Sequence, residues 1–513
     1  MKYRRQKGML FVALALLLPL ALTSCGGGMG TTAGGGTGGT GVGPVTGFGS
    51  VKVNGVEYAT DNANIVIGGV EHRPESELKV GMRVRVRGPF TGTTGAAERI
   101  EVIRELRGPM DDNGVDNVLN RVRVAGQTIL IDPATIFDNV ADILALQTLQ
   151  AGTLRHPEVE VHGGADDSGF IHATYLRKGA DDFPIATDNT EVRGKISGLT
   201  PVNSRLLIGS LQVNYTGASL VNVPLTGLAN GMYVEVKGKL TAAGGSGTLN
   251  ASRIEALDNT VGNNSDAVRI EGYVVSGTSK DSFELLGPGG KVSVDGRGAT
   301  LSGGTVAPGK KVQVEGAVSG AILRADVVRV RPANSVKIEG VMTGPPTPSD
   351  NITVLSKTVQ VDAYTRFKDD VLQLRTFGLS NLSPNDNVQV VGSYDGSRVH
   401  AIRVERIVPN DPGLVLLQGP LDNGSIVPQV SFDIVGIRVT SLANFANTEF
   451  KDALGNTVSM PTFFSTVLPG IQPDQVIKVK RGVFHAGTLG FPSTVRDEDS
   501  TRNMEVEIEQ INN

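Results

Sequence analysis

One short pattern, Val-x-Val-x-Gly, recurs along the chain and constrains the fold more than any other feature. Strict copies stand at 84–88, 159–163, 234–238, 312–316 and 388–392, and a sixth at 476–482 is one residue out of step. Alternation of β-branched and variable residues with period two is typical of a strand with one buried face. We therefore expect the valines in a core and the intervening residues in solvent.

A second glycine recurs at the start of each repeat, in a strand of the form x-Gly-x. These glycines are Gly47, Gly108, Gly194, Gly272, Gly340 and Gly419. A residue without a Cβ lets a first strand bend sharply between the two halves of a small barrel. Three strands, an optional helix and two further strands follow the element order of a five-stranded OB-type barrel.

The repeats predict an all-β chain that is a bead-on-a-string, tandem array of about six small five-stranded OB-like β-barrels. Some of the barrels are expected to carry a short capping helix. The predicted units are 45–106, 107–182, 190–258, 268–333, 334–410 and 411–513, the last with an insert.

The helices are expected in inserts at 140–144 and 371–374, where apolar residues recur at helical spacing. Each insert follows a similar stretch, Thr-Ile-Phe-Asp at 135–138 and Thr-Arg-Phe-Lys at 365–368. A third stretch of this kind, Thr-Glu-Phe-Lys, stands at 448–451.

Residues 1–24 predict an export signal. A basic start is followed by an apolar run at 9–21, which is too short to span about 30 Å of hydrocarbon as a helix and matches the apolar part of a signal peptide. The run ends in a segment that resembles the lipobox of bacterial lipoproteins and consists of Leu22, Thr23, Ser24 and Cys25. The resemblance implies cleavage before Cys25 and lipidation of its thiol.

Attachment through two or three acyl chains would hold the protein stably to a membrane. Related lipoproteins that stay in the inner membrane usually carry Asp after the cysteine, whereas this chain carries Gly26. We therefore expect a protein anchored to the bacterial outer membrane and facing the periplasm, with exposure at the cell surface left open. Residues 25–44 are rich in Gly and Thr and predict a coiled tether.

The charge balance argues against nucleic acid as a partner. The chain has 48 basic and 52 acidic residues, and cleavage before Cys25 would remove four of the basic ones, so the mature net charge is about −8. Polyanion binders usually carry a basic excess. The chain also lacks Trp, and only 5% of its residues are aromatic, which is low for a protein that stacks sugars or bases on rings.

The first unit resembles a known family on the residues 47–58 (GFGSVKVNGVEY) and 78–82 (LKVGM). That family is a bacterial domain family of unknown function, which occurs as tandem OB-like β-barrels in envelope lipoproteins. Units two to five resemble it more loosely, and the sixth departs most. The resemblance implies an envelope lipoprotein, and it brings no catalytic residues that could be assigned here.

One stretch of the second unit is a candidate metal site. His156, Glu158, Glu160 and His162 alternate, so a strand would place them on one face, and imidazole with carboxylate suits zinc or a similar ion. The other interpretation is a solvated strand face, because same-side neighbours on a strand lie about 6.5–7 Å apart, which is wide for ligands of one ion.

The insert of the sixth unit, at about 441–470, holds the largest aromatic cluster. Its members are Phe445, Phe450, Phe463 and Phe464. They predict either the core of an enlarged barrel or a docking patch for a partner.

The sequence holds no nucleophile elbow, metalloprotease helix or dinucleotide-binding glycine motif. We therefore expect a protein that is not an enzyme and needs no cofactor. Its expected role is that of an adaptor or binding module for an envelope protein or glycan. One alternative is a lipoprotein that binds an oligosaccharide or polyanion, and another is a metal-dependent enzyme or module with its chemistry in unit two or unit six.

Overall fold

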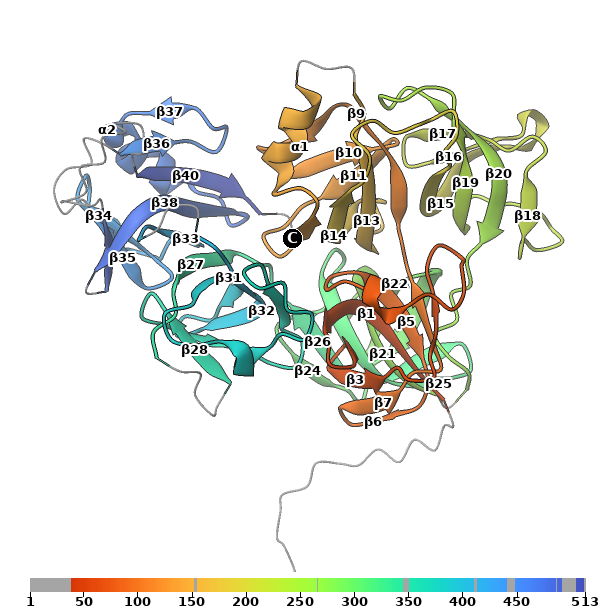
Figure 1. Ribbon diagram of the computed structural model, residues 1–513, viewed down its shortest axis with the longest axis horizontal. Helices are drawn as coiled ribbons and strands as arrows, with labels where there is room; N and C mark the ends of the chain where they lie inside the picture. The colour runs from red at the N-terminus through yellow and green to blue at the C-terminus, as the bar shows by residue number, and fades with distance from the viewer. Residues whose placement is uncertain are drawn as a thin grey trace, which may run out of the picture. The chain divides into compact units, whose positions relative to one another are not determined.

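The computed structural model describes residues 38–151, 155–264, 266–344, 350–409, 413–440, 448–485, 487–490 and 504–511. Within these ranges most of the regular structure is β, in three sheets of 14, 12 and 14 strands (Figure 1). The predicted signal peptide, the lipobox residues, Cys25 and Phe445 lie outside the described residues. In the part of the chain that is described, no helix is both long and apolar enough to cross a membrane.

The first sheet combines the first and fourth predicted units. Its strands are β1 (Gly39–Gly47), β2 (Val51–Val53), β3 (Val56–Ala59), β4 (Asn64–Val66), β5 (Arg83–Arg87), β6 (Phe90–Thr91), β7 (Thr94–Ala96), β8 (Arg99–Val102), β21 (Ala267–Ser279), β22 (Ser282–Gly287), β23 (Gly290–Asp295), β24 (Thr300–Ser302), β25 (Lys311–Ser319) and β26 (Ile322–Arg331).

The second sheet combines the second and third units. Its strands are β9 (Leu106–Asp116), β10 (Arg121–Val124), β11 (Gln127–Leu130), β12 (Ile136–Asp138), β13 (Glu158–Ala165), β14 (Ile171–Lys178), β15 (Thr190–Thr200), β16 (Arg205–Ile208), β17 (Leu211–Asn214), β18 (Ser219–Val221), β19 (Tyr233–Leu240) and β20 (Thr248–Ala256).

The third sheet combines the fifth and sixth units. Its strands are β27 (Val336–Val341), β28 (Asn351–Val354), β29 (Lys357–Gln360), β30 (Arg366–Asp369), β31 (Asn387–Tyr394), β32 (Val399–Arg406), β33 (Val415–Gly419), β34 (Ser431–Ile434), β35 (Ile437–Thr440), β36 (Glu449–Lys451), β37 (Thr457–Val458), β38 (Gln475–His485), β39 (Thr488–Gly490) and β40 (Glu505–Gln510).

Two groups of five strands form closed barrels, because the first and the last strand of each group are paired with each other. In one barrel β21, β22, β23, β26 and β25 pair in that order, and β25 returns to β21. In the other barrel β9, β10, β11, β14 and β13 pair in the same way, and β13 returns to β9. The expected barrels are therefore present in these two units.

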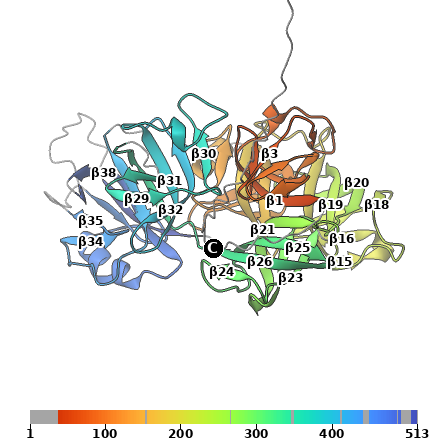
Figure 2. The same ribbon diagram turned by 90° about the horizontal axis from the view of Figure 1, so that it is seen from below.

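The units are joined in pairs through hydrogen bonds between their first strands. β1 runs parallel to β21, with residues 39–42 opposite 267–270, and Figures 1 and 2 show the two strands side by side. β9 is antiparallel to β15, and β27 is antiparallel to β33. The bead-on-a-string arrangement is therefore wrong, because paired units share one sheet.

The alternating valines form the cores, as predicted. In the five strict repeats both valines are fully buried, at 0% exposure. In the sixth repeat Ile477 and Val479 take these places, which accounts for the register that is one residue out of step. Burial of one such side chain contributes about 1.5–3 kcal/mol.

The glycine that ends the repeat marks a β-bulge. Register shifts occur beside it in four units, and a Cβ built there would lie 1.9–2.2 Å from a carbonyl oxygen of the next strand. The four glycines are Gly163, Gly238, Gly316 and Gly392. Only glycine permits this close approach of two backbones.

The intervening residues are not all in solvent, contrary to the prediction. Glu160 is 6% exposed, and His162 and Gln313 are 0% exposed. The reason is that segments of other units cover these outward faces. The ring of His162, for example, contacts the carbonyl oxygen of Ile103 in the first unit at 2.9 Å.

Of the two predicted helices, the structure contains one. Helix α1 (Ile143–Gln150) begins at an N-cap, Asp142, which accepts a hydrogen bond from the Ala145 amide. The stretch at 371–374 is an exposed loop instead. Its amides at Val371, Leu372 and Leu374 donate to the Asp369 carboxylate, and this alternative bonding replaces the helix.

Further short helical turns lie at Glu75–Glu77, Pro201–Asn203, Leu379–Asn381, Met460–Thr462 (α2), Phe463–Val467 and Leu468–Gly470.

The first strand begins inside the segment predicted to be a tether. Residues 39–44 belong to β1, and glycine is required there because neighbouring side chains approach closely. A Cβ at Gly41 would lie 2.7 Å from the Tyr58 hydroxyl, and one at Gly43 would lie 2.4 Å from Oδ1 of Asn54. The glycines at this end of the low-complexity stretch therefore serve packing.

Candidate binding cavity

The predicted metal ligands of the second unit are each bound to other groups. Their partners are the Met110 carbonyl for His156, Arg107 for Glu158, Arg104 and Arg177 for Glu160, and the Ile103 carbonyl with Glu160 for His162. Burial opposes ionisation of Glu160, but His162 and the arginines outweigh it and hold the pKa well below its usual range. Across the described ranges, no three His, Cys, Asp or Glu side chains are grouped as a metal site.

The aromatic residues of the sixth unit that the structure describes lie in its core. Phe450, Phe463 and Phe464 are at most 3% exposed and pack with Phe432. The ring centroids of Phe450 and Phe463 are 4.7 Å apart. These three rings therefore form part of a hydrophobic core in the structure.

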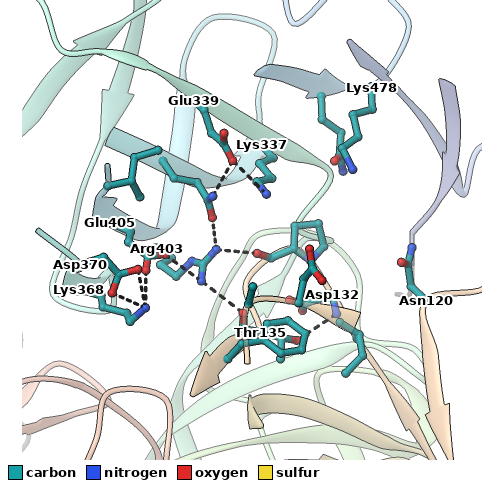
Figure 3. Close-up of a pocket in the computed structure, with 18 of the residues that line it drawn as sticks. Asn120, Asp132, Thr135, Lys337, Glu339, Lys368, Asp370, Arg403, Glu405 and Lys478 are labelled. Carbon is teal, nitrogen blue, oxygen red and sulfur yellow. Dashed lines mark hydrogen bonds and ion pairs between the residues drawn. The ribbon is translucent and has the colours of Figure 1, made fainter. Parts of the chain in front are cut away.

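A cavity of about 440 Å³ has a mainly polar lining. It is lined by residues of the second, fifth and sixth units (Figure 3). The second unit contributes 131–133, 135, 137 and 140–142, together with Asn120. The fifth and sixth units contribute Lys337, Glu339, Lys368, Asp370, Gln389, Arg403, Glu405, Ile407, Val408, Gln418, Lys478, Glu509 and Gln510.

Lys368 lies between two carboxylates on the cavity wall. Its Nζ is 2.7 Å from Asp370 and 2.6 Å from Glu405 (Figure 3). Burial, together with the neighbouring Glu405, raises the pKa of Asp370 to about 6. The pKa of Glu405 falls to about 2, because Arg403 and hydrogen bonds from Asp370 and Lys368 outweigh its burial. Of the two carboxylates that contact the Lys368 ammonium, Glu405 is thus the one that stays ionised at neutral pH and below.

Arg403 ties the fifth unit to the second. Its guanidinium donates to the carbonyl oxygens of Thr135 at 3.3 Å and Pro133 at 3.0 Å, and also to the Gln389 side chain. It lies 3.2 Å from Glu405. Because Arg403 is only 6% exposed, these contacts fix the wall of the cavity.

A second ion pair lies on β27, in the same sheet as Arg403 and Glu405. Nζ of Lys337 is 3.2 Å from Glu339, and Gln389 donates to the same carboxylate at 2.7 Å. Burial lowers the pKa of Lys337, and the nearby Lys478 adds to this effect. Lys478 in turn pairs with Glu509 at 2.5 Å.

The remaining acidic residues of the lining are held by uncharged donors. Asp132 accepts from the Asn334 side chain at 3.0 Å and from the Ala134 amide at 2.6 Å, and Asp142 caps helix α1. Every charged side chain of the lining therefore has a partner within the protein. The lining also contains Gln418, which is 1% exposed and whose Nε2 has no partner in the structure.

Two short strands, β12 and β30, form the wall between this cavity and a neighbouring one. Thr135, just before β12, and Phe137 within it line the polar cavity, as do Lys368 in β30 and Asp370 just after it. Residues alternate between the faces of a strand, so the intervening side chains face away. They line a second cavity, of about 250 Å³, together with Phe137 and Lys368.

Sequence reasoning missed this site, although the chain carried a signal for it. The similar stretches at 135–138 and 365–368 are the wall strands of the two cavities. In both, the threonine hydroxyl donates at 2.8 Å to a backbone carbonyl of the neighbouring strand, at Ala173 for Thr135 and at Ala401 for Thr365. The signal in the sequence is that this Thr-x-Phe stretch recurs although it does not belong to the Val-x-Val-x-Gly pattern of the cores.

Comparison with known families matches four segments of the chain. The family model is described as a domain of unknown function, DUF5666, and it matches residues 42–101, 107–176, 193–255 and 339–405. A search of the curated proteins finds no match. The prediction of six copies of the family is corrected to four, because the model does not match the fourth and sixth predicted units. The matches cover about half of the chain, which therefore belongs to the DUF5666 family.

Proposed function

We propose that this chain is a non-enzymatic binding module of the bacterial envelope whose ligand is an uncharged glycan held in the polar cavity. It is attached through lipid on Cys25 to the outer membrane and faces the periplasm. Its repeats are OB-like barrels that build the cavity jointly.

The pairing of the charges in the lining carries this proposal. Each lysine, arginine and carboxylate there already has a partner, so a charged ligand would have to break an existing pair. Breaking a buried pair costs about 3–5 kcal/mol. Hydroxyl groups, in contrast, can donate to the carboxylates and accept from the ammonium groups and amides without displacing them. A hydroxyl-rich, neutral molecule therefore suits the cavity better than a polyanion.

The side-chain amide nitrogen of Gln418, which has no hydrogen-bond partner in the structure, also favours a ligand with hydroxyl groups. A buried donor without an acceptor costs about 1–3 kcal/mol, and a ligand oxygen or a water would remove that cost. The cavity volume also lies in the range of small-molecule sites, about 300–1,000 Å³.

The strand order favours OB-like barrels. In the closed barrels the first strand pairs with the second and fourth, and the third runs parallel to the fifth. OB folds commonly bind oligosaccharides or oligonucleotides. The acidic balance of the chain disfavours the second of these ligands.

Titration calorimetry tests the proposal, with the mature chain in a detergent that contains no sugar. The probes are chitotetraose and maltotetraose, which are neutral, and a heparin tetrasaccharide. A neutral probe should bind and the heparin fragment should not. Ala141→Trp, which places a large side chain at the cavity lining, should abolish binding.

The matched control is Leu144→Trp, an exposed position of helix α1 outside the lining. It should bind like the parent. Failure of both neutral probes to bind, or binding that survives Ala141→Trp, would contradict the proposal. A preference for heparin would favour the polyanion alternative instead.

A further inference from the structure

The second cavity gathers aromatic rings in a chain that has few of them. Its lining includes Phe48, Phe137, Tyr175 and Phe367, with Ile136 and Leu374. Phe137 and Phe367 stand at equivalent positions of the wall strands β12 and β30 and are partly exposed. Each of the two residues lines the cavity and also packs against a hydrophobic core of the protein.

Contacts with neighbouring groups hold the other rings in place. Tyr175 donates to the Asp138 carboxylate, and burial raises the pKa of its hydroxyl. The Arg375 guanidinium lies 3.6 Å from the centroid of the Phe48 ring and donates to the Leu78 carbonyl at 2.8 Å. The walls of the cavity are thus fixed before a ligand arrives, which reduces the ordering cost of binding.

Polar groups surround the rings. Ser76, Lys79, Asp138, Asp369 and Arg375 also line this cavity. Apolar ring faces with hydrogen-bonding groups around them match a sugar, which has an apolar C–H face and hydroxyls at its edge. An acyl chain would offer these polar groups no hydrogen bond, whereas sugar hydroxyls can donate to the carboxylates and accept from Lys79 and Arg375.

The two cavities are adjacent. Phe137 and Lys368 line both of them. A chain of linked sugars that leaves the polar cavity past Lys368 reaches the rings directly.

Resting on the function proposed above, we propose that the aromatic cavity is a second subsite, in which another sugar of the same glycan stacks on Phe367 and Phe137. The ligand is then an oligosaccharide of at least two linked sugars. The polar cavity holds one sugar by hydrogen bonds, and the aromatic cavity adds affinity through ring contact.

Calorimetry with two neutral series tests this subsite: N-acetylglucosamine, chitobiose and chitotetraose, and glucose, maltose and maltotetraose. In the series that binds, the tetrasaccharide should bind at least tenfold more tightly than the single sugar. Phe367→Ala should weaken the tetrasaccharide about tenfold and leave the single sugar unchanged. Phe367→Tyr keeps a ring and should bind like the parent.

The outcomes separate this inference from the proposed function. Equal affinities along a series, or an equal loss for single sugar and tetrasaccharide in Phe367→Ala, would overturn the second subsite and leave the polar cavity as the site. If neither series binds, both the subsite and the proposed function fail. Retained binding of the single sugar by Phe367→Ala also shows that the variant is folded.

Discussion

The glycine at the bulge of each repeat allows a quantitative prediction, for which Gly316 in the fourth unit is a clear example. A Cβ there would lie 1.9 Å from the carbonyl oxygen of Arg324 and 2.8 Å from Cα of Ala325, and both atoms belong to the backbone of β26. Real Cβ contacts are rarely shorter than 3.0 Å, so β25 and β26 would have to separate by about 1 Å.

Gly316→Ala should therefore be strongly destabilising. Overpacking of this kind costs about 1–3 kcal/mol. Separation of the strands also weakens about two ladder hydrogen bonds, each worth about 0.5–1.5 kcal/mol. We expect a total loss of about 3 kcal/mol, which is a factor of more than 100 in the opening equilibrium of this barrel.

Hydrogen exchange with mass spectrometry measures this opening in peptides that cover 311–331. Gly298→Ala is the matched control, because a Cβ at Gly298 in the same unit meets nothing within 4 Å. The control should exchange like the parent, whereas Gly316→Ala should exchange more than 100 times faster where exchange follows opening. Equal exchange in the two variants would refute the steric explanation of the repeated glycine.

Three further predictions concern the ion pairs and the anchor. Arg406 and backbone amides lower the pKa of Asp369 to about 2, so its stabilisation of about 2 kcal/mol is complete above pH 3.8 and is lost as the pH falls through 2. Urea unfolding should show Asp369→Asn weakened by that amount at pH 7, with the difference narrowing towards pH 2, and a constant difference would contradict the assignment. Arg83→Met should cost about 3–5 kcal/mol in thermal unfolding, because it leaves buried Glu105 unpaired, and the double variant with Glu105→Met should recover part of the loss. No recovery would exclude that explanation. Cys25→Ser should abolish incorporation of labelled palmitate and release the protein from the membrane fraction, and continued membrane retention would rule out the lipid anchor.

The local pattern was sufficient to predict the cores. Alternation at positions such as Val312 and Val314 reflects burial on one face of a strand, and that property depends on near neighbours. The pattern did not reveal that Glu160 and Gln313 are also buried, because the segments that cover them come from elsewhere in the chain. Variation at a position is therefore no proof of exposure, since Glu160 is buried against two arginines and Gln313 is buried without a hydrogen-bond partner.

The prediction of a helix at 371–374 is wrong for a related reason. Its apolar spacing suits a helix, but one carboxylate, Asp369, accepts three amides of the stretch and is itself held by Arg406 at 2.7 Å. For the wall strands β12 and β30, the local pattern is informative but its consequence is not. Their similarity is visible in the sequence, but the cavities arise where the second and fifth units meet each other and a third unit, and no local pattern encodes these contacts.

The parallel pairing of β1 with β21 has a consequence for how the molecule assembles. Gly39 finds its partner Ala267 only after roughly 230 further residues have emerged. At about 5–20 residues per second, the β1 edge of the first unit stays unpaired for roughly 10–50 seconds of synthesis. An unpaired strand edge can pair with strands of other chains. A chain truncated after the third unit would keep this edge unpaired permanently. The fourth unit, which the family model does not match, therefore covers this edge of the first unit through the pairing of β21 with β1.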